Sequence, residues 1–364
     1  MSVEDLKRVN WQDGMALNKE HFIQTEDYFI WQLCDYSQLL INKYNYGFLP
    51  KSCDDYKDGQ IIELHERLDG KIRITLIACN IITLDGIKIN ISASEASKLN
   101  LCCSFDTNKM ISNQNVLSVM LSVFPFQRMA CGVIDSSEEP PRIPNVQTVL
   151  KLKLLDSLNT IDVDTSSIII AKIRYSMGRW IIDNSYIPPS LSMISLNSLS
   201  ELYINSKDLV IRLLNYCREI IDKINLYDNN INLTRNIKLL CLSIYSFLNT
   251  NLYYFNSYLK YQRPIDFINF FVKIAACVDN TFLRINKTHT IELLEYFNEW
   301  TSILPGDFKT IVSDLLSLEY ESLDINHSMH TLVQFMKNLV FVMEKMCELD
   351  YIGRHRENLV ISRT

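Results

Sequence analysis

Residues 9–22 read VNWQDGMALNKEHF and join a short apolar segment to a turn and then to the start of a helix. Asp13-Gly14 predicts the turn, because glycine readily adopts the positive φ that a tight reversal needs. From Phe22 onward, apolar residues recur at intervals of three and four, which is typical of one face of an α-helix. We expect this helix to begin soon after the turn and to end at Gly47. The residues of the predicted apolar face are Phe22, either Tyr28 or Phe29, Leu33, Tyr36, Leu39, Leu40 and Tyr44.

Two interpretations of this stretch stay open. On the local residues alone, Trp11 and Phe22 are expected to fill a core, because an aromatic stripe at helical spacing usually packs inside a protein. The order V-x-W-x-x-G-M-x-L-x-x-x-H-F, however, resembles the opening motif of the TssK family, the trimeric baseplate component of bacterial type VI secretion systems. Members of that family usually have Gln where this chain has Glu20. The motif residues here are Trp11, Gly14, Met15, Leu17, His21 and Phe22.

Length, charge and cysteine content exclude several classes of protein. A chain of 364 residues suggests about two domains. The formal net charge is −6, and no Lys/Arg cluster or stripe stands out, which argues against a nucleic-acid partner. The ten cysteines form no CxxC pair, and Glu4, Asp5 and Lys7 lie where a cleavable signal peptide would be apolar, so we expect a reducing cytoplasm. No segment has the roughly eighteen uninterrupted apolar residues of a membrane span.

Short strand-like runs follow the opening helix. Residues 60–66 and 71–79 flank Asp69-Gly70, and residues 81–84 and 87–91 flank Asp85-Gly86, so each set predicts a β-hairpin. Further strands are expected at 115–125, 148–155, 167–175 and 180–182, with an exposed, proline-rich connection at 135–144. The sequence therefore predicts a β-sandwich-like N-terminal domain over residues 1–190.

A second resemblance to the TssK family lies at residues 167–193. Family members close their N-terminal β domain with a similar strand, glycine turn, strand and Ile-Pro-Pro element. In this chain the last element is Ile187-Pro188-Pro189. Because proline fixes φ and lacks a backbone donor, Pro188 and Pro189 are expected to form a stiff exit from the sheet, which suits a rigid joint between domains.

The pattern becomes helical after Leu196. Amphipathic helices are expected at about 196–226, 234–261, 265–283 and 290–303, and short connections make them a bundle over residues 191–304. The leucine spacing of the first helix also leaves open a seam between copies of the chain. Two more helices, at about 308–318 and 327–349, form a short C-terminal region over 305–364. Known TssK proteins carry a longer mixed α/β head there, so we transfer no membrane-complex site onto these residues.

Motifs for catalysis or metal binding are missing from the sequence. It contains no P-loop, GxGxxG, GxSxG or HExxH, and His327 and His330 have no further ligand at a recognisable offset. We therefore expect an α+β protein with no catalytic, cofactor-binding or metal residues and no enzymatic activity.

The TssK resemblance implies a structural function. It implies a homotrimeric baseplate adaptor in the cytoplasm, recruited to the inner-membrane secretion apparatus, that binds wedge proteins of the TssF and TssG type and faces the membrane complex. Two alternatives stay open: a receptor-binding subunit of a phage tail, which has similar shoulder domains, and a hydrolase with a scattered site around His65 or His289.

Overall fold

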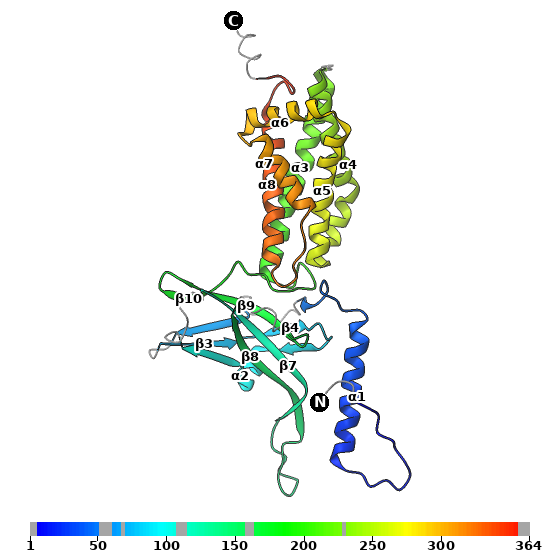
Figure 1. The fold of residues 1–364 in the computed structure, drawn as a ribbon, viewed down its shortest axis with the longest axis vertical. Coiled ribbons are helices and arrows are strands. Elements are labelled where there is room, and N and C mark those ends of the chain that lie inside the picture. Colours follow the sequence, from blue (N-terminus) through cyan, green and yellow to red (C-terminus); the bar gives the residue numbers. More distant parts are fainter. Residues whose placement is uncertain are drawn as a thin grey trace. The chain divides into compact units, whose positions relative to one another are not determined.

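The computed structural model describes residues 6–50, 60–66, 70–106, 115–156, 164–227 and 231–355. The chain divides into two compact units, Met1–Leu191 and Ser192–Thr364. All the described strands belong to the first unit, and the second consists of helices and their connections (Figure 1). The expected α+β fold, with N-terminal strands followed by helices, is confirmed.

Three antiparallel sheets make up the first unit, in the strand orders β1-β4-β5, β2-β3-β6 and β10-β9-β7-β8. Its elements in chain order are α1 (Lys19–Gln38), β1 (Gly47–Phe48), β2 (Ile62–Glu66), β3 (Lys71–Leu76), β4 (Cys79–Ile82), β5 (Lys88–Ile91), α2 (Ala93–Leu99), β6 (Cys102–Asp106), β7 (Val116–Cys131), β8 (Asn145–Asp156), β9 (Ser167–Ser176) and β10 (Arg179–Ile182).

Both expected hairpins are present. β2 pairs with β3 and β4 pairs with β5, each in antiparallel register. Gly70 and Gly86 have φ of 75° and 81°, the left-handed region that made Asp-Gly a turn signal. Asp69 of the first turn lies outside the described residues.

The core of the first unit lies between its sheets. On β3 the side chains of Ile72, Ile74 and Leu76 are buried, whereas alternate residues are more accessible, so one face of this strand is apolar. Phe105 of β6 packs edge-on against Trp180 of β10, with ring centroids 5.3 Å apart. Because these two strands belong to different sheets, this contact packs the β2-β3-β6 sheet against the β10-β9-β7-β8 sheet at this point, as a sandwich requires.

Strand β7 is longer than the sequence predicts. We expected it to end at Pro125, but it continues to Cys131 and forms a long hairpin with β8 (Figure 1). The pairing passes from Phe124–Val149 directly to Arg128–Thr148, so the three residues between are outside the ladder. Such a bulge accommodates a proline because no ladder hydrogen bond is required there. The connection at 135–144 is largely exposed, as expected.

Six α-helices and one short 3₁₀ helix form the described part of the second unit, close to the predicted ranges. They are α3 (Asn197–Tyr227), α4 (Asn232–Ser257), η4 (Leu259–Tyr261), α5 (Pro264–Arg284), α6 (Lys287–Thr301), α7 (Pro305–Leu316) and α8 (Ile325–Glu348). Helices α7 and α8 pack within the same unit as α3–α6, so the region after Pro305 is part of the bundle.

Aromatic and aliphatic side chains fill the bundle. Phe255 of α4 lies 4.8 Å from Phe270 of α5 between ring centroids, and the Tyr203 hydroxyl of α3 donates to the Phe255 carbonyl at 2.9 Å. On α3, Leu213 and Ile220 are fully buried. The apolar face of α3 is therefore covered by its own unit, chiefly α4 and α8, and the leucine spacing reflects this packing.

Candidate partner-binding surface

The TssK-like motif folds back along the start of α1. Gly14 has a φ of 77°, and the Met15 N–H donates to the Gln12 carbonyl at 3.2 Å, which closes the expected turn. Asn18 then caps α1: its side chain accepts from the His21 N–H at 3.1 Å, and the His21 ring accepts from the Asn18 N–H at 3.4 Å. This reciprocal pair is a capping box, with His21 in the place where Glu or Gln is usual.

Trp11, His21 and Phe22 form an exposed aromatic cluster. The Trp11 ring lies 6.0 Å from the His21 ring and 6.3 Å from the Phe22 ring, between centroids. Trp11 is 49% exposed and Phe22 is 57% exposed. The interpretation that these two side chains fill a core is therefore wrong, because they pack on each other and leave about half of each surface to solvent. Leu17, in the same segment, is also exposed, and Met15 is half-buried.

Helix α1 ends earlier than expected and is anchored by polar contacts. It stops at Gln38 with Leu39 as its C-cap, so Gly47 does not end it and instead begins β1. Near its middle, the Arg128 guanidinium of β7 contacts Asp27 at 2.6 Å and Glu26 at 3.0 Å. Partial burial alone would lower the Arg128 pKa, but the hydrogen bonds and charges of Asp27 and Glu26 outweigh it, and the pKa is raised. Arg128 therefore stays charged and holds the helix to the sheet.

Pro188 and Pro189 lie apart from the motif and are buried. The Phe48 N–H of β1 donates to the Pro189 carbonyl, and the Leu191 N–H donates to the Phe48 carbonyl, both at 2.8 Å. The Ile-Pro-Pro element therefore runs alongside β1 as part of the first unit's core, while its prolines contribute acceptors rather than donors. This pairing could not be predicted from the sequence, because β1 has only two residues.

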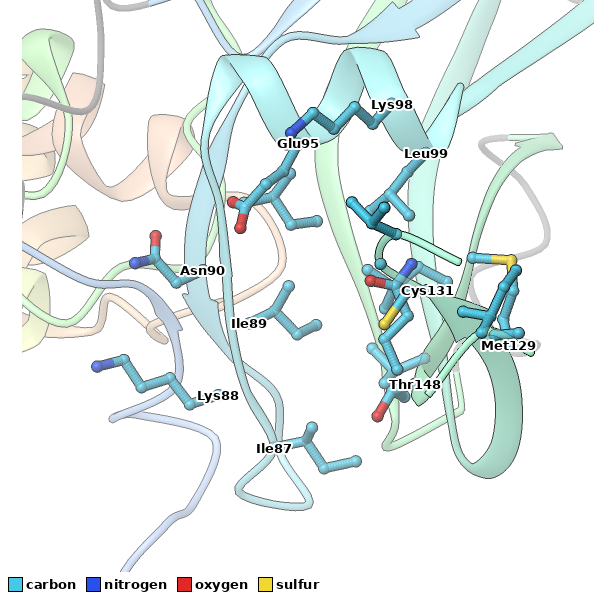
Figure 2. A pocket seen from close by; sticks show the side chains of 18 residues that line it. Ile87, Lys88, Ile89, Asn90, Glu95, Lys98, Leu99, Met129, Cys131 and Thr148 are labelled. Carbon is cyan, nitrogen blue, oxygen red and sulfur yellow. The ribbon is translucent and has the colours of Figure 1, made fainter. Parts of the chain in front are cut away.

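An apolar groove of about 850 Å³ opens between β5, α2 and the β7–β8 hairpin. Figure 2 shows Ile87 and Ile89 on one side, and Met129, Cys131 and Thr148 on the other. Lys88, Glu95 and Lys98 are its charged residues, and Glu95 already caps α2: its carboxylate accepts from the Ser92 N–H at 2.9 Å. This hydrogen bond, with the one from the Ser92 hydroxyl, lowers the Glu95 pKa.

His65 and His289, the two histidines considered as centres of a hydrolase site, lie outside both the motif and the groove. His65 is on β2 and contacts the Glu63 carboxylate at 3.1 Å, with both side chains about half exposed. His289 lies in the first turn of α6, where its backbone N–H donates to the Asn286 cap at 2.8 Å. His65 belongs to the first unit and His289 to the second.

Comparison with solved structures finds a similar architecture in TssK. A crystal structure of TssK superposes with a TM-score of 0.56 over 92% of this chain and 70% of that chain, at 15% sequence identity. TssK of the EAEC type VI secretion system, solved with the nanobody nb18, gives a TM-score of 0.50 over 87% of this chain and 98% of that chain, at 13% identity. The chain has the TssK fold. No family model and no curated protein sequence matches it.

A chain from the TssK-TssF-TssG baseplate subcomplex is a weaker match to this chain, with a TM-score of 0.47, 14% identity, and 92% of this chain and 99% of that chain covered. The two TssK structures described first confirm the sequence-based resemblance to TssK at the level of fold. On that fold, the motif residues at 11–22 occupy an accessible segment and a helix start, and Pro188-Pro189 a buried element. Across the described parts of the chain, every helix is too short or too polar to span a membrane.

Proposed function

We propose that this chain is a structural subunit of a type VI secretion baseplate. In this role it is a cytoplasmic homotrimer that binds wedge proteins of the TssF and TssG type and links them to the membrane complex. It carries out no reaction. The proposal combines the TssK fold with the opening motif, two similarities that come from different properties of the chain.

The single observation that carries the proposal is the exposure of the motif. A cluster that only supported a core would be covered, yet Trp11, Leu17 and Phe22 are accessible while the capping box holds the segment in place. Exposed aromatic residues on a rigid element are typical of the anchors that dominate protein interfaces. We therefore assign the wedge-binding surface to the segment 9–22 and assign no residues to the membrane complex.

The test is co-purification of the full-length chain with the TssF- and TssG-like proteins encoded beside it. We expect Trp11→Ala combined with Phe22→Ala to reduce recovery of the wedge proteins at least tenfold, because interface aromatic residues contribute about 2 kcal/mol or more each. A matched control replaces two exposed tyrosines of the second unit, Tyr253→Ala and Tyr258→Ala, which should leave recovery unchanged. If the aromatic double variant folds, judged by circular dichroism, and still recovers wedge proteins at the wild-type level, the assignment is wrong.

A further inference from the structure

Strand β5 leaves one edge of its sheet without a partner strand. The order β1-β4-β5 makes β1 and β5 the outer strands. The β1 edge is closed, because the Phe48 N–H donates to the Pro189 carbonyl and the Leu191 N–H donates to the Phe48 carbonyl. Among the described residues, no segment closes the β5 edge in this way. An open edge presents backbone donors and acceptors with which another strand can pair.

The register of β4 and β5 identifies the open backbone groups. The Thr83 N–H donates to the Ile87 carbonyl at 3.1 Å, so Ile87 directs its backbone groups toward β4. This direction alternates along an antiparallel pair, so Ile89 also bonds to β4, whereas Lys88 and Asn90 turn their N–H and C=O groups outward. The backbones of these two residues form no hydrogen bond to the described part of the chain.

The apolar groove follows this open edge. All of residues 87–91 line it, both those with buried side chains and those with exposed ones, which places it along the rim of the strand and not over one face. Figure 2 shows Ile87, Lys88, Ile89 and Asn90 on one side, with the β7–β8 hairpin opposite. A segment that enters the groove therefore meets open backbone groups on one side and the hairpin on the other.

We propose that this edge binds an extended segment of another protein, which joins the sheet as a strand beside β5. The occupant is extended because an α-helix uses its backbone groups internally and could not bond to Lys88 or Asn90. β5 has four residues, so the pairing covers about 13 Å of the partner at about 3.3 Å per residue.

The side chains of β5 define the pattern of the partner. They alternate along the strand: Ile89 and Ile91 are buried, and Lys88 and Asn90 are exposed. Paired strands place neighbouring side chains on the same face of a sheet. The partner segment should therefore have apolar residues at every second position, beside the isoleucines, and polar residues between them.

The charges of the groove favour an acidic partner. Its charged lining residues are Lys88, Lys98 and Glu95, so two lysines and one glutamate give +1, in a chain whose net charge is −6. The Glu95 carboxylate is already bonded to the Ser92 N–H and hydroxyl, at 2.9 and 2.8 Å. A lysine on an open edge also discourages pairing with a purely apolar strand. An Asp or Glu on the partner's polar face, opposite Lys88, removes that obstacle.

The inference does not depend on the baseplate role, and its first test is peptide selection. A phage-displayed library of random eight-residue peptides is panned on the full-length chain. We expect the enriched peptides to alternate apolar and polar residues and to carry Asp or Glu at a polar position. Failure to enrich this pattern would overturn the proposal.

Asn90→Pro tests strand addition directly, with the affinity of a selected peptide measured by fluorescence anisotropy. Proline removes the outward N–H of residue 90 and leaves the ladder with β4 intact, because that N–H takes no part in it. We expect the affinity to fall at least tenfold, whereas Asn90→Thr, which keeps the N–H, should bind as the wild type does. Wild-type affinity in a folded Asn90→Pro, judged by circular dichroism, would show that the peptide does not pair with β5.

A change in the peptide makes the test independent of how Asn90→Pro folds. A bound strand directs alternate N–H groups toward β5, so N-methylation of one alternating set of residues should reduce affinity at least tenfold and N-methylation of the other set should leave it within twofold. Equal effects of the two sets would contradict strand addition.

Two further variants test the charge preference and the location of the peptide. Lys88→Glu should weaken binding of an acidic peptide at least tenfold, and replacing the peptide's acid with lysine should restore it; unchanged affinity would contradict the contact with Lys88. Trp11→Ala combined with Phe22→Ala should bind the peptide as the wild type does, because both residues lie outside the groove. Loss of wedge recovery and loss of peptide binding are thus separate results, and either proposal can fail without the other.

Discussion

Position 47 accepts only glycine, for two separate structural reasons. Its φ is 109°, a region that L side chains rarely adopt, and a Cβ built on it would lie 2.0 Å from the Pro189 carbonyl oxygen. The close approach lets the Phe48 N–H reach that same carbonyl. The lack of a side chain at Gly47 therefore permits the contact with Pro189, although 142 positions separate the two residues (189 − 47).

Replacing Gly47 with Ala should therefore destabilise the first unit by about 3 kcal/mol, since the new Cβ adds a clash with backbone to the conformational strain. Gly178→Ala is the matched control: its φ is 82°, but nothing lies within 4 Å of the added Cβ. Only the strain remains there, so we expect a loss of about 1 kcal/mol. Urea unfolding followed by tryptophan fluorescence measures both. Equal losses for the two variants would show that the approach to Pro189 is not tight.

At the scale of elements, α1 depends on one arginine. Asp27 is buried, and Arg128 neutralises it while also reaching Glu26. Arg128→Met should leave the Asp27 carboxylate without its cation, at a cost of about 2 kcal/mol in the docking of α1. We expect faster hydrogen exchange of the α1 amides, with β9 and β10 unaffected.

Arg142→Met provides the control for that experiment. Arg142 pairs with Glu138 in the exposed connection between β7 and β8, and an exposed ion pair contributes little to stability because solvent screens it. Its exchange pattern should match the wild type in α1. If Arg128→Met gave the same pattern as Arg142→Met, the contact with Asp27 and Glu26 would not be what holds α1 to the sheet.

The local turns and helices could be predicted from the sequence, but the distant residues that pack against them could not. The Asp-Gly turns and the helical repeats after Leu196 depend on residues near one another in the chain, and they lie within a few positions of where we expected them. Gly47 was misassigned because the residue that it accommodates, Pro189, is distant. Periodicity identified the apolar stripe of α1 but carried no information on what covers it, which explains the error over Trp11 and Phe22.

The same limit applies to the candidate surface at the scale of the whole chain. The motif around Trp11 was visible because its residues are close in sequence. The Arg128 ion pair was not, since its partners lie more than 100 positions away. The only signal for it was a charged residue three positions after Pro125, just beyond a strand-like run, which is weak. The groove beside β5 was equally hidden, because β5, α2 and the β7–β8 hairpin form it together.

The two units are expected to unfold separately, because each has its own buried core. Gly353 offers a probe of the second unit: its φ is 85°, a Cβ there would lie 2.2 Å from the Thr234 hydroxyl oxygen, and its N–H donates to the Tyr296 hydroxyl at 2.9 Å. Gly353→Ala should lower the midpoint of the helical transition by several degrees, since a loss of 1 kcal/mol shifts a unit of this size by about 2–4 °C.

Calorimetry of the full-length chain, with circular dichroism to identify the helical transition, checks this expectation. Gly353→Ala should move only the transition that carries the helical signal, and Gly47→Ala only the other. Because a shared core would couple the two, a single transition that both variants shift equally would mean that the chain unfolds as one cooperative body. Separate transitions would mean that substitutions in the first unit, such as Trp11→Ala with Phe22→Ala, can be interpreted without correcting for the bundle, which is the condition that the wedge-binding experiment needs.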